Sequence, residues 1–265
     1  MIDLAQVHGQ EAAKRALEVA AAGGHPIALI GPGGAGKSML ARCLPGLLPA
    51  TAEERPVRAP HSNVTAKALR SELDLAADGV LILDDLPLLR PATLRALAEA
   101  LDGGVTAQIV ATMRPCPCGH RGDRLHVCGC TAGAVRRHRA RVAPVLDRLD
   151  LIVAVPALTL GELRARPTEC SSRVAARVDA AREIQTHRGG LNAAMGPAEI
   201  QTHCPLDSPA RQLLDTAFER LALSAAALHR VLRVARTLAD IAGAEPLSAA
   251  HVAEAVQYGS ERVGW

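Results

Sequence analysis

A glycine-rich run followed by lysine and serine is the strongest chemical signal in the sequence. It fits the pattern G-x-x-x-x-G-K-[ST], in which small residues let successive backbone N–H groups surround phosphate oxygens. In this pattern the lysine reaches the β- and γ-phosphates, and the serine hydroxyl binds Mg²⁺. The sequence therefore predicts nucleotide binding by Gly31, Pro32, Gly33, Gly34, Ala35, Gly36, Lys37, Ser38 and Met39.

Two acidic residues follow the apolar run at 80–83. The carboxyl ends of parallel strands lie beside such a phosphate loop. We therefore predict that Asp84 holds a Mg²⁺-bound water and that Asp85 polarises the attacking water. The alternative is that both acids only cap the turn before Pro87.

Four of the seven cysteines form two closely spaced pairs: Cys116, Cys118, Cys128 and Cys130. Four thiolates favour a tetrahedral structural Zn²⁺ site, in which His120 or His126 could replace one ligand. Reduced surface thiols and a redox pair are the alternatives. Because the chain shows no export signal, we expect a cytoplasmic protein in which paired cysteines indicate metal before disulfide.

Apolar runs alternate with helical patterns in the first part of the chain. Buried strands are predicted at 27–30, 80–83, 108–113 and 151–155, with one edge strand within 50–64. Helices are predicted between them, at 10–22, 37–48, 65–77 and 91–101. This alternation predicts an α/β domain with a parallel sheet over residues 1–156, including a cysteine-rich loop at 114–131.

Only helical patterns follow Pro156. They lie at 160–163, 173–187, 197–204, 208–221, 224–242 and 248–258. We therefore predict a second, all-helical domain over residues 157–265.

The composition excludes several classes of protein. The 49% hydrophobic and 22% charged residues are typical of a globular chain. The longest apolar stretches, such as 151–158, are too short to span a bilayer, so we expect no membrane partner. Phe218, Tyr258 and Trp265 are the only aromatic residues, which argues against nucleic-acid binding by base stacking. The basic run at 136–141 predicts a DNA phosphate contact, a subunit interface or a solvated helix face.

Together these features resemble the magnesium-chelatase-like AAA+ ATPases of the ComM (competence protein) or YifB type. The resemblance runs in order through 7–18, 31–41, 58–61, 78–87, 114–119, 144–150 and 229–240. It implies a P-loop α/β domain with a helical lid, assembled as a ring, usually of six, with Mg²⁺ and ATP between subunits. It also implies ATP-driven DNA branch migration in recombination.

The resemblance implies roles for three arginines. Arg148 corresponds to the arginine finger donated to a neighbour's γ-phosphate, and Arg233 to the lid arginine that senses the bound phosphate. Arg114 stands at the sensor position. A planar, permanently charged guanidinium suits charge that is spread over phosphoryl oxygens. A solvated helix arginine is the alternative for Arg148 and Arg233.

Two of the departures from this family concern missing segments. The ComM type carries an N-terminal Lon-like domain, which we expect this chain to lack. Family residues are also absent between Leu48 and Arg58, around 69–75, and before Gln108. Inserts of this kind line the ring pore, so their absence weighs against DNA translocation.

Two further departures are substitutions at the expected catalytic centre. Asp85 stands where the family has Glu, and Arg114 where it has Asn. A base displaced by about 1 Å can lower a rate on the order of a hundredfold. We therefore expect Mg-ATP binding with slow hydrolysis. The alternatives are a degenerate, non-catalytic ring subunit and a metal-chelatase motor subunit.

Overall fold

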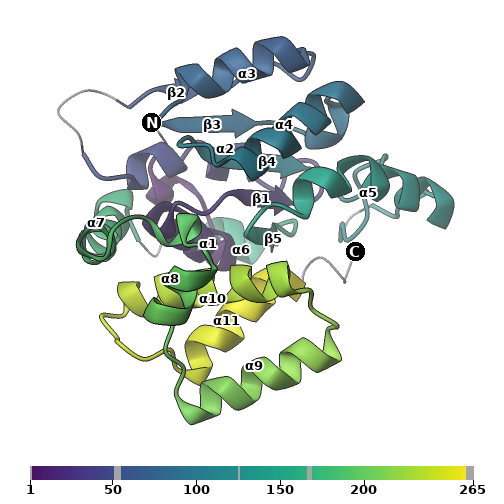
Figure 1. The fold of residues 1–265 in the computed structure, drawn as a ribbon. Helices are drawn as coiled ribbons and strands as arrows, with labels where there is room; N and C mark the ends of the chain where they lie inside the picture. Colours follow the sequence, from purple (N-terminus) through teal and green to yellow (C-terminus); the bar gives the residue numbers. More distant parts are fainter. Residues whose placement is uncertain (1, 51–54, 125, 166–168, 261–265) are drawn as a thin grey trace.

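The described residues form a parallel five-stranded sheet with helices on both faces (Figure 1). The computed structural model describes residues 2–50, 55–124, 126–165 and 169–260. The strands are β1 (Ile27–Ile30), β2 (Val57–Arg58), β3 (Val80–Leu83), β4 (Gln108–Met113) and β5 (Leu151–Ala154), in the order β2-β3-β4-β1-β5. The predicted α/β fold class and all predicted strands are confirmed, with β2 as the edge strand.

Side-chain alternation along the strands divides the core between the two faces of the sheet. Ile27 and Leu29 face a cluster that contains α1 (Glu11–Gly23), whereas Ala28 and Ile30 face a second cluster. Helices α3 (Ala66–Leu75), α4 (Pro91–Gly103) and α5 (Ala132–Leu146) supply that second cluster. Both faces are therefore covered, which suits strands that are apolar throughout.

Two helical segments differ from the sequence-based expectation. The helix beginning at Lys37 was predicted to reach Leu48, but α2 covers only Lys37–Ala41, and a separate 3₁₀ turn spans Leu44–Leu47. Pro45 lies in that turn, where it removes a backbone donor and interrupts the helix. Helix α5 was predicted only as a basic run, because arginine and histidine occupy nearly every position from 136 to 141.

The predicted helices of the second half are all present. They are α6 (Leu160–Arg164), α7 (Ser171–Arg188), α8 (Pro197–His203), α9 (Ser208–Arg220), α10 (Ala225–Ile241) and α11 (Ala249–Ser260). Helices α6, α9 and α10 begin after Thr159, Asp207 and Ser224, whose side chains accept backbone N–H groups. The family-type C-terminal helical region is thus present.

The helical half and the α/β half share one hydrophobic core among the described residues. Leu17 of α1 and Val153 of β5 belong to the same buried cluster as Val178 of α7 and Leu238 of α10. The predicted boundary at residue 157 therefore separates the α/β elements from the all-helical elements, but the hydrophobic core continues across it. None of the described helices combines the length and apolarity needed to cross a membrane.

Candidate nucleotide site

The glycine-rich loop begins where β1 ends and adopts a backbone that requires glycine. Gly34 and Gly36 have φ angles of 75° and 89°, in the left-handed region that side chains disfavour. A Cβ placed on Gly33, Gly34 or Gly36 would meet no atom within 4 Å. These glycines thus face open space, and the left-handed backbone at Gly34 and Gly36 favours glycine.

Polar groups from three parallel strands meet at the carboxyl end of the sheet. The Ser38 hydroxyl, just after the loop, donates to Asp84 Oδ1 at 2.8 Å. The Thr112 hydroxyl on β4 donates to the same oxygen at 2.9 Å and accepts the backbone N–H of Asp85 at 3.1 Å. Lys37 Nζ donates to the Pro32 carbonyl at 2.6 Å. The predicted loop and acidic strand end are therefore brought together.

Asp85 is paired by Arg114, the residue at the predicted sensor position. Arg114 Nε and Nη2 lie 3.0 and 2.9 Å from Asp85 Oδ2. The other carboxylate oxygen, Oδ1, is buried and has no hydrogen-bond partner among the described residues. Asp85 also has a φ of 56°, a conformation that Asp tolerates better than most residues. One carboxylate oxygen is thus held by a cation, while the other is buried without a partner among the described residues.

The electrostatics of Lys37 match an anion site. Burial lowers the pKa of Lys37 below its usual value, and the charge of Arg114 adds to this effect. The carboxylates of Asp85 and Asp84 act in the opposite direction. Two cations therefore lie close to two acids, and a phosphate would relieve the unfavourable pairing of Lys37 with Arg114.

Two positioning residues were not predicted from sequence. Gln10, itself with φ of 57°, donates from Nε2 to the carbonyls of Ala35 and Pro156 at 3.1 and 2.7 Å, and so ties the loop to the end of β5. Thr112 bonds to both acids, as described above. A buried polar residue at the end of an otherwise apolar strand was the available signal for Thr112.

Arg148 and Arg233 lie at the opposite, amino end of the sheet. Both line a cavity of about 490 Å³, together with Arg55, Arg182 and the carboxylate of Asp150. Burial lowers the pKa of Arg182 to about 10, and the charge of Arg55 adds to the shift. The cavity is therefore rich in positive charge and suits an anion.

The two cavity arginines differ in how firmly they are held. Arg233 Nη2 lies 3.1 Å from the buried Asp150, whereas Arg148 Nη2 pairs at 2.7 Å with the exposed Asp102 of α4. An exposed pair of this kind contributes little to stability, because solvent screens it. Arg148 is therefore free to exchange its partner at small cost.

The structure does not bring these arginines to the phosphate loop of the same chain. Asp150 precedes β5, and Ala154 at its other end pairs with Ile30, which precedes the loop. At about 3.3 Å of rise per residue, β5 separates the two sites by roughly 13 Å. Arg148 and Arg233 thus lie away from the phosphate loop of their own chain.

A buried polar network joins the lid helix α10 to the amino end of the sheet. His25 is fully buried, with Nδ1 at 2.7 Å from Asp150 Oδ2 and Nε2 at 2.7 Å from the Thr237 hydroxyl of α10. Burial alone raises the pKa of Asp150, but the hydrogen bond and charge of His25 and the charge of Arg233 outweigh it and hold that pKa below its usual value. The network therefore fixes Arg233 relative to the sheet.

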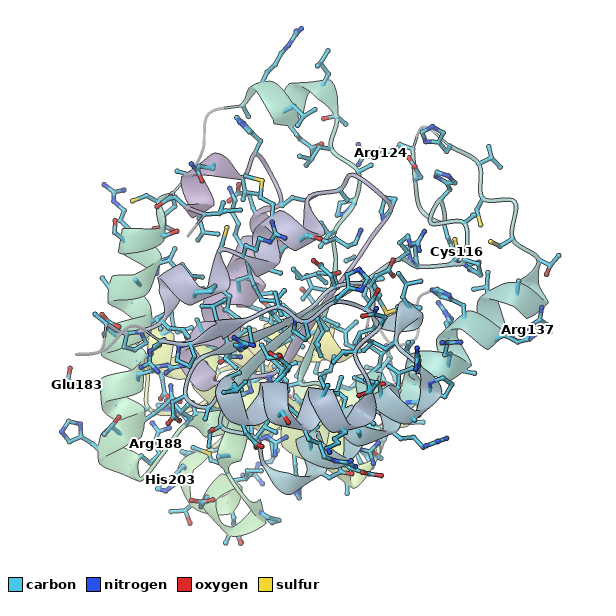
Figure 2. All side chains as sticks on the ribbon, turned by 90° about the horizontal axis from the view of Figure 1, so that it is seen from above. Cys116, Arg124, Arg137, Glu183, Arg188 and His203 are labelled. Atoms are coloured by element: carbon cyan, nitrogen blue, oxygen red, sulfur yellow. The ribbon has the colours of Figure 1, made fainter. Side chains whose placement is uncertain are left out.

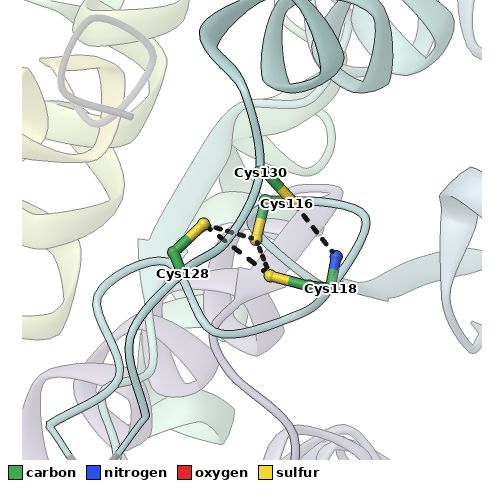
Figure 3. Close-up of side chains that lie close together, drawn as sticks. All are labelled: Cys116, Cys118, Cys128 and Cys130. Atoms are coloured by element: carbon green, nitrogen blue, oxygen red, sulfur yellow. Dashed lines mark hydrogen bonds between the residues drawn. The ribbon is translucent and has the colours of Figure 1, made fainter.

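The four predicted cysteines form one cluster in a loop beside α5 (Figure 3). Their sulfur atoms all lie within 4.8 Å of one another, and all four thiols are free. His120, Asp123 and His126 form a second group in the same loop. Figure 2 places Cys116 and Arg137 at one end of the molecule and Glu183, Arg188 and His203 at the other.

Comparison with known proteins agrees with this arrangement. The family described as magnesium chelatase, subunit ChlI, matches residues 3–59 and 50–163, and its C-terminal counterpart matches residues 168–259. The chain belongs to the magnesium chelatase ChlI family. This membership, with the loop and acidic strand end, supports an AAA+-type nucleotide-binding module.

Two curated relatives extend the likeness along the chain. The competence protein ComM of Haemophilus influenzae is 35% identical over 97% of this chain. The uncharacterized protein YifB of Escherichia coli is 37% identical over the same share. The chain spans only about 60% of the length of each relative. The aligned 307 positions exceed the 265 residues of the chain, so ComM has positions without a counterpart here.

The ChlI family suggests Mg²⁺ as well as nucleotide, and the oxygen atoms present fit that ion. Mg²⁺ prefers hydroxyl, carboxylate, phosphate and water oxygens. Ser38 and Asp84 place a hydroxyl and a carboxylate oxygen side by side, 2.8 Å apart, next to the loop. These two residues can therefore hold the ion directly or through its waters.

Proposed function

We propose that the chain binds Mg-ATP at the loop 31–39 and hydrolyses it slowly. The observation that carries the proposal is the hydrogen bond from Ser38 to Asp84, which links the loop to the acidic strand end. Two functional segments far apart in the sequence are thereby assembled at one point. A glycine-rich turn without a ligand role would not need this partner.

Each residue of the site has a defined task in this proposal. Backbone N–H groups of the loop and Lys37 bind the phosphates. Bound Mg²⁺ would neutralise charge on the β- and γ-phosphates, and Ser38 and Asp84 hold it. Asp85 Oδ1, which is buried without a partner in the described structure, accepts a hydrogen bond from the attacking water. Thr112 orients the Asp84 carboxylate and holds the backbone N–H of Asp85.

Hydrolysis is slow in this proposal because Arg114 competes for Asp85. The guanidinium lies 2.9 Å from Asp85 Oδ2 and holds the carboxylate that must orient the water. Arg114 also lacks the acceptor that an Asn amide would offer a water molecule. The same ion pair favours the alternative that the chain is a non-catalytic, nucleotide-binding ring subunit.

We further propose that copies of the chain assemble as a ring, so that the amino end of one sheet meets the carboxyl end of the next. Arg148 then acts on the neighbour's γ-phosphate, and Arg233 senses it. The support is that both arginines line one cavity rich in positive charge on the side away from their own loop. A hexamer in the cytoplasm, a DNA substrate as in ComM-type motors, and a metal-chelatase partner are finer proposals on the same basis.

Single-turnover hydrolysis tests the catalytic part. We expect the wild-type chain to turn over Mg-ATP slowly and the double variant Asp85→Glu with Arg114→Asn to be about tenfold faster or more. Equilibrium dialysis with ATP reports binding separately. If the double variant binds ATP but shows no turnover, the non-catalytic alternative replaces this proposal. Molar mass by light scattering, with and without ATP, tests the ring.

A further inference from the structure

The sulfur atoms of the cysteine cluster have the spacing of a metal tetrahedron. With a Zn–S bond of about 2.3 Å, two sulfurs of a tetrahedral site lie about 3.8 Å apart. Cys116 Sγ lies 3.5 Å from Cys118 Sγ and 3.7 Å from Cys128 Sγ, and the latter two are 3.7 Å apart (Figure 3). A disulfide would require about 2.05 Å. The geometry thus fits four thiolates around one ion.

Backbone N–H groups point at two of these sulfurs. The N–H of Cys118 donates to Cys130 Sγ at 3.4 Å, and the N–H of Arg121 donates to Cys116 Sγ at 3.3 Å. Such outer bonds stabilise the thiolate form that binds metal and orient it. These hydrogen bonds therefore favour negatively charged thiolates in the cluster over neutral thiols.

The loop that carries the cluster has little hydrophobic core of its own. Cys116 is fully buried, but Val127 is 95% exposed and Cys118 is exposed. A segment of this kind buries too little apolar surface to offset the entropy of ordering it. A bound ion would supply the missing free energy, since metal binding and local folding are coupled.

The same loop forms one side of a hollow beside the phosphate loop. Pro115, Arg121 and Gly122 line a cavity of about 350 Å³ together with Gly31 and Pro32. The loop also supports the Arg114 side chain, because a Cβ on Gly119 would lie 3.0 Å from Arg114 Cδ. On the other side, His138 of α5 lies 2.9 Å from the Arg114 carbonyl oxygen. The position of the loop is thus tied to the residue that pairs with Asp85.

We propose that Cys116, Cys118, Cys128 and Cys130 bind one Zn²⁺ and that this ion holds the loop as a wall of the nucleotide pocket. The four thiols lose their protons to solvent as the ion binds. Zinc binding itself does not depend on the proposed ATPase function. The role of the loop as a pocket wall rests on the proposed ATPase function and adds to it, because the loop positions Arg114 at the site.

Metal analysis of the purified protein tests the ion. We expect one zinc per chain, lost in Cys118→Ser and in Cys130→Ser. Cys170→Ser and His126→Ala are matched controls that should keep the zinc, since Cys170 lies outside the cluster and His126 belongs to the second group. Replacing zinc by Co²⁺ in the wild-type chain should give the visible absorption of a tetrahedral tetrathiolate. This measurement does not depend on the variants folding.

Loss of zinc in His126→Ala but not in the cysteine variants would overturn the ligand assignment. Absence of zinc and of Co²⁺ binding in reduced wild-type protein would overturn the site itself.

Hydrogen exchange tests the wall independently of ATP. On zinc removal by a chelator, we expect faster exchange in peptides covering 115–124 and also in those covering 31–36. Peptides from α10 serve as the internal reference, because they should remain protected if the chain stays folded. Faster exchange confined to the cysteine loop would contradict the role of this loop as a pocket wall.

ATP titrations of the same samples give a second test. We expect the affinity for ATP to fall about fivefold without zinc. Failure of the zinc-loaded chain to bind ATP would overturn the proposed function and leave the metal site standing.

Discussion

The carboxyl end and the amino end of the sheet are built in contrasting ways. At the carboxyl end, Ser38, Thr112 and the two acids bond to one another around an open glycine loop. At the amino end, arginines line a large cavity, and Arg148 is held there by an exposed acid and by the Pro144 carbonyl. One end is organised to receive a ligand. The other carries cations that lie away from the phosphate loop of their own chain. This difference is the basis for our proposal that a complete site is shared by two copies.

The largest expected effect comes from removing the cation at the amino end. Arg148→Ala should lower the hydrolysis rate about a thousandfold, because an arginine finger stabilises charge that develops in the transition state. ATP affinity should change little. Steady-state hydrolysis and dialysis measure the two quantities, and Arg211→Ala, an exposed arginine of α9, is the control. An equal loss of affinity and rate would place Arg148 in the binding site of its own chain.

Asp150→Asn should destabilise the amino end by about 3 kcal/mol, because it leaves the buried His25 and the half-buried Arg233 without their carboxylate. Since the folded pKa of Asp150 is depressed, its contribution is present above the unfolded pKa of about 3.9 and is lost as pH falls through the folded pKa. Urea unfolding at neutral pH and near pH 3 should show the difference between wild type and variant shrinking in acid. Asp147→Asn, at an exposed neighbour, is the control; a similar loss there would show that the effect is not specific to the network.

At the carboxyl end, Lys37→Ala should weaken ATP binding on the order of a hundredfold, as expected for losing charge-assisted hydrogen bonds. Stability should be unaffected or slightly improved, because burial already disfavours the charged form of Lys37. Fluorescent nucleotide titration measures the affinity. Lys67→Ala, on the exposed side of α3, should bind like wild type. Unchanged affinity in Lys37→Ala would remove the loop from the binding site.

The smallest effect is expected from Asp102→Asn. Loss of this exposed partner of Arg148 should barely change the free energy of unfolding, because solvent screens the pair. The rate of hydrolysis should rise slightly, because the finger no longer has to leave a partner in its own chain. Thermal unfolding and steady-state assays measure both. A large loss of stability would mean that Arg148 is a structural residue.

The strands and the phosphate loop could be predicted because their signals are local. Four apolar residues bounded by glycine or acid specify β1 and β3, and the glycine spacing specifies the loop. The predicted end of α2 at Leu48 was wrong, because the helical pattern of the sequence continues through Pro45, whereas the helix ends at Ala41. The pairing of Arg114 with Asp85, the role of Gln10 and the location of Arg148 and Arg233 away from the loop depend on contacts between distant segments. No local pattern encodes such contacts.

Nucleotide binding is tested by titrating the folded wild-type chain with ATP in the presence and absence of Mg²⁺, followed by calorimetry and by equilibrium dialysis. We expect saturable binding of one nucleotide per chain, tighter with Mg²⁺ than without it. Absence of saturable binding by both methods, in protein whose fold is verified by circular dichroism, would contradict this expectation.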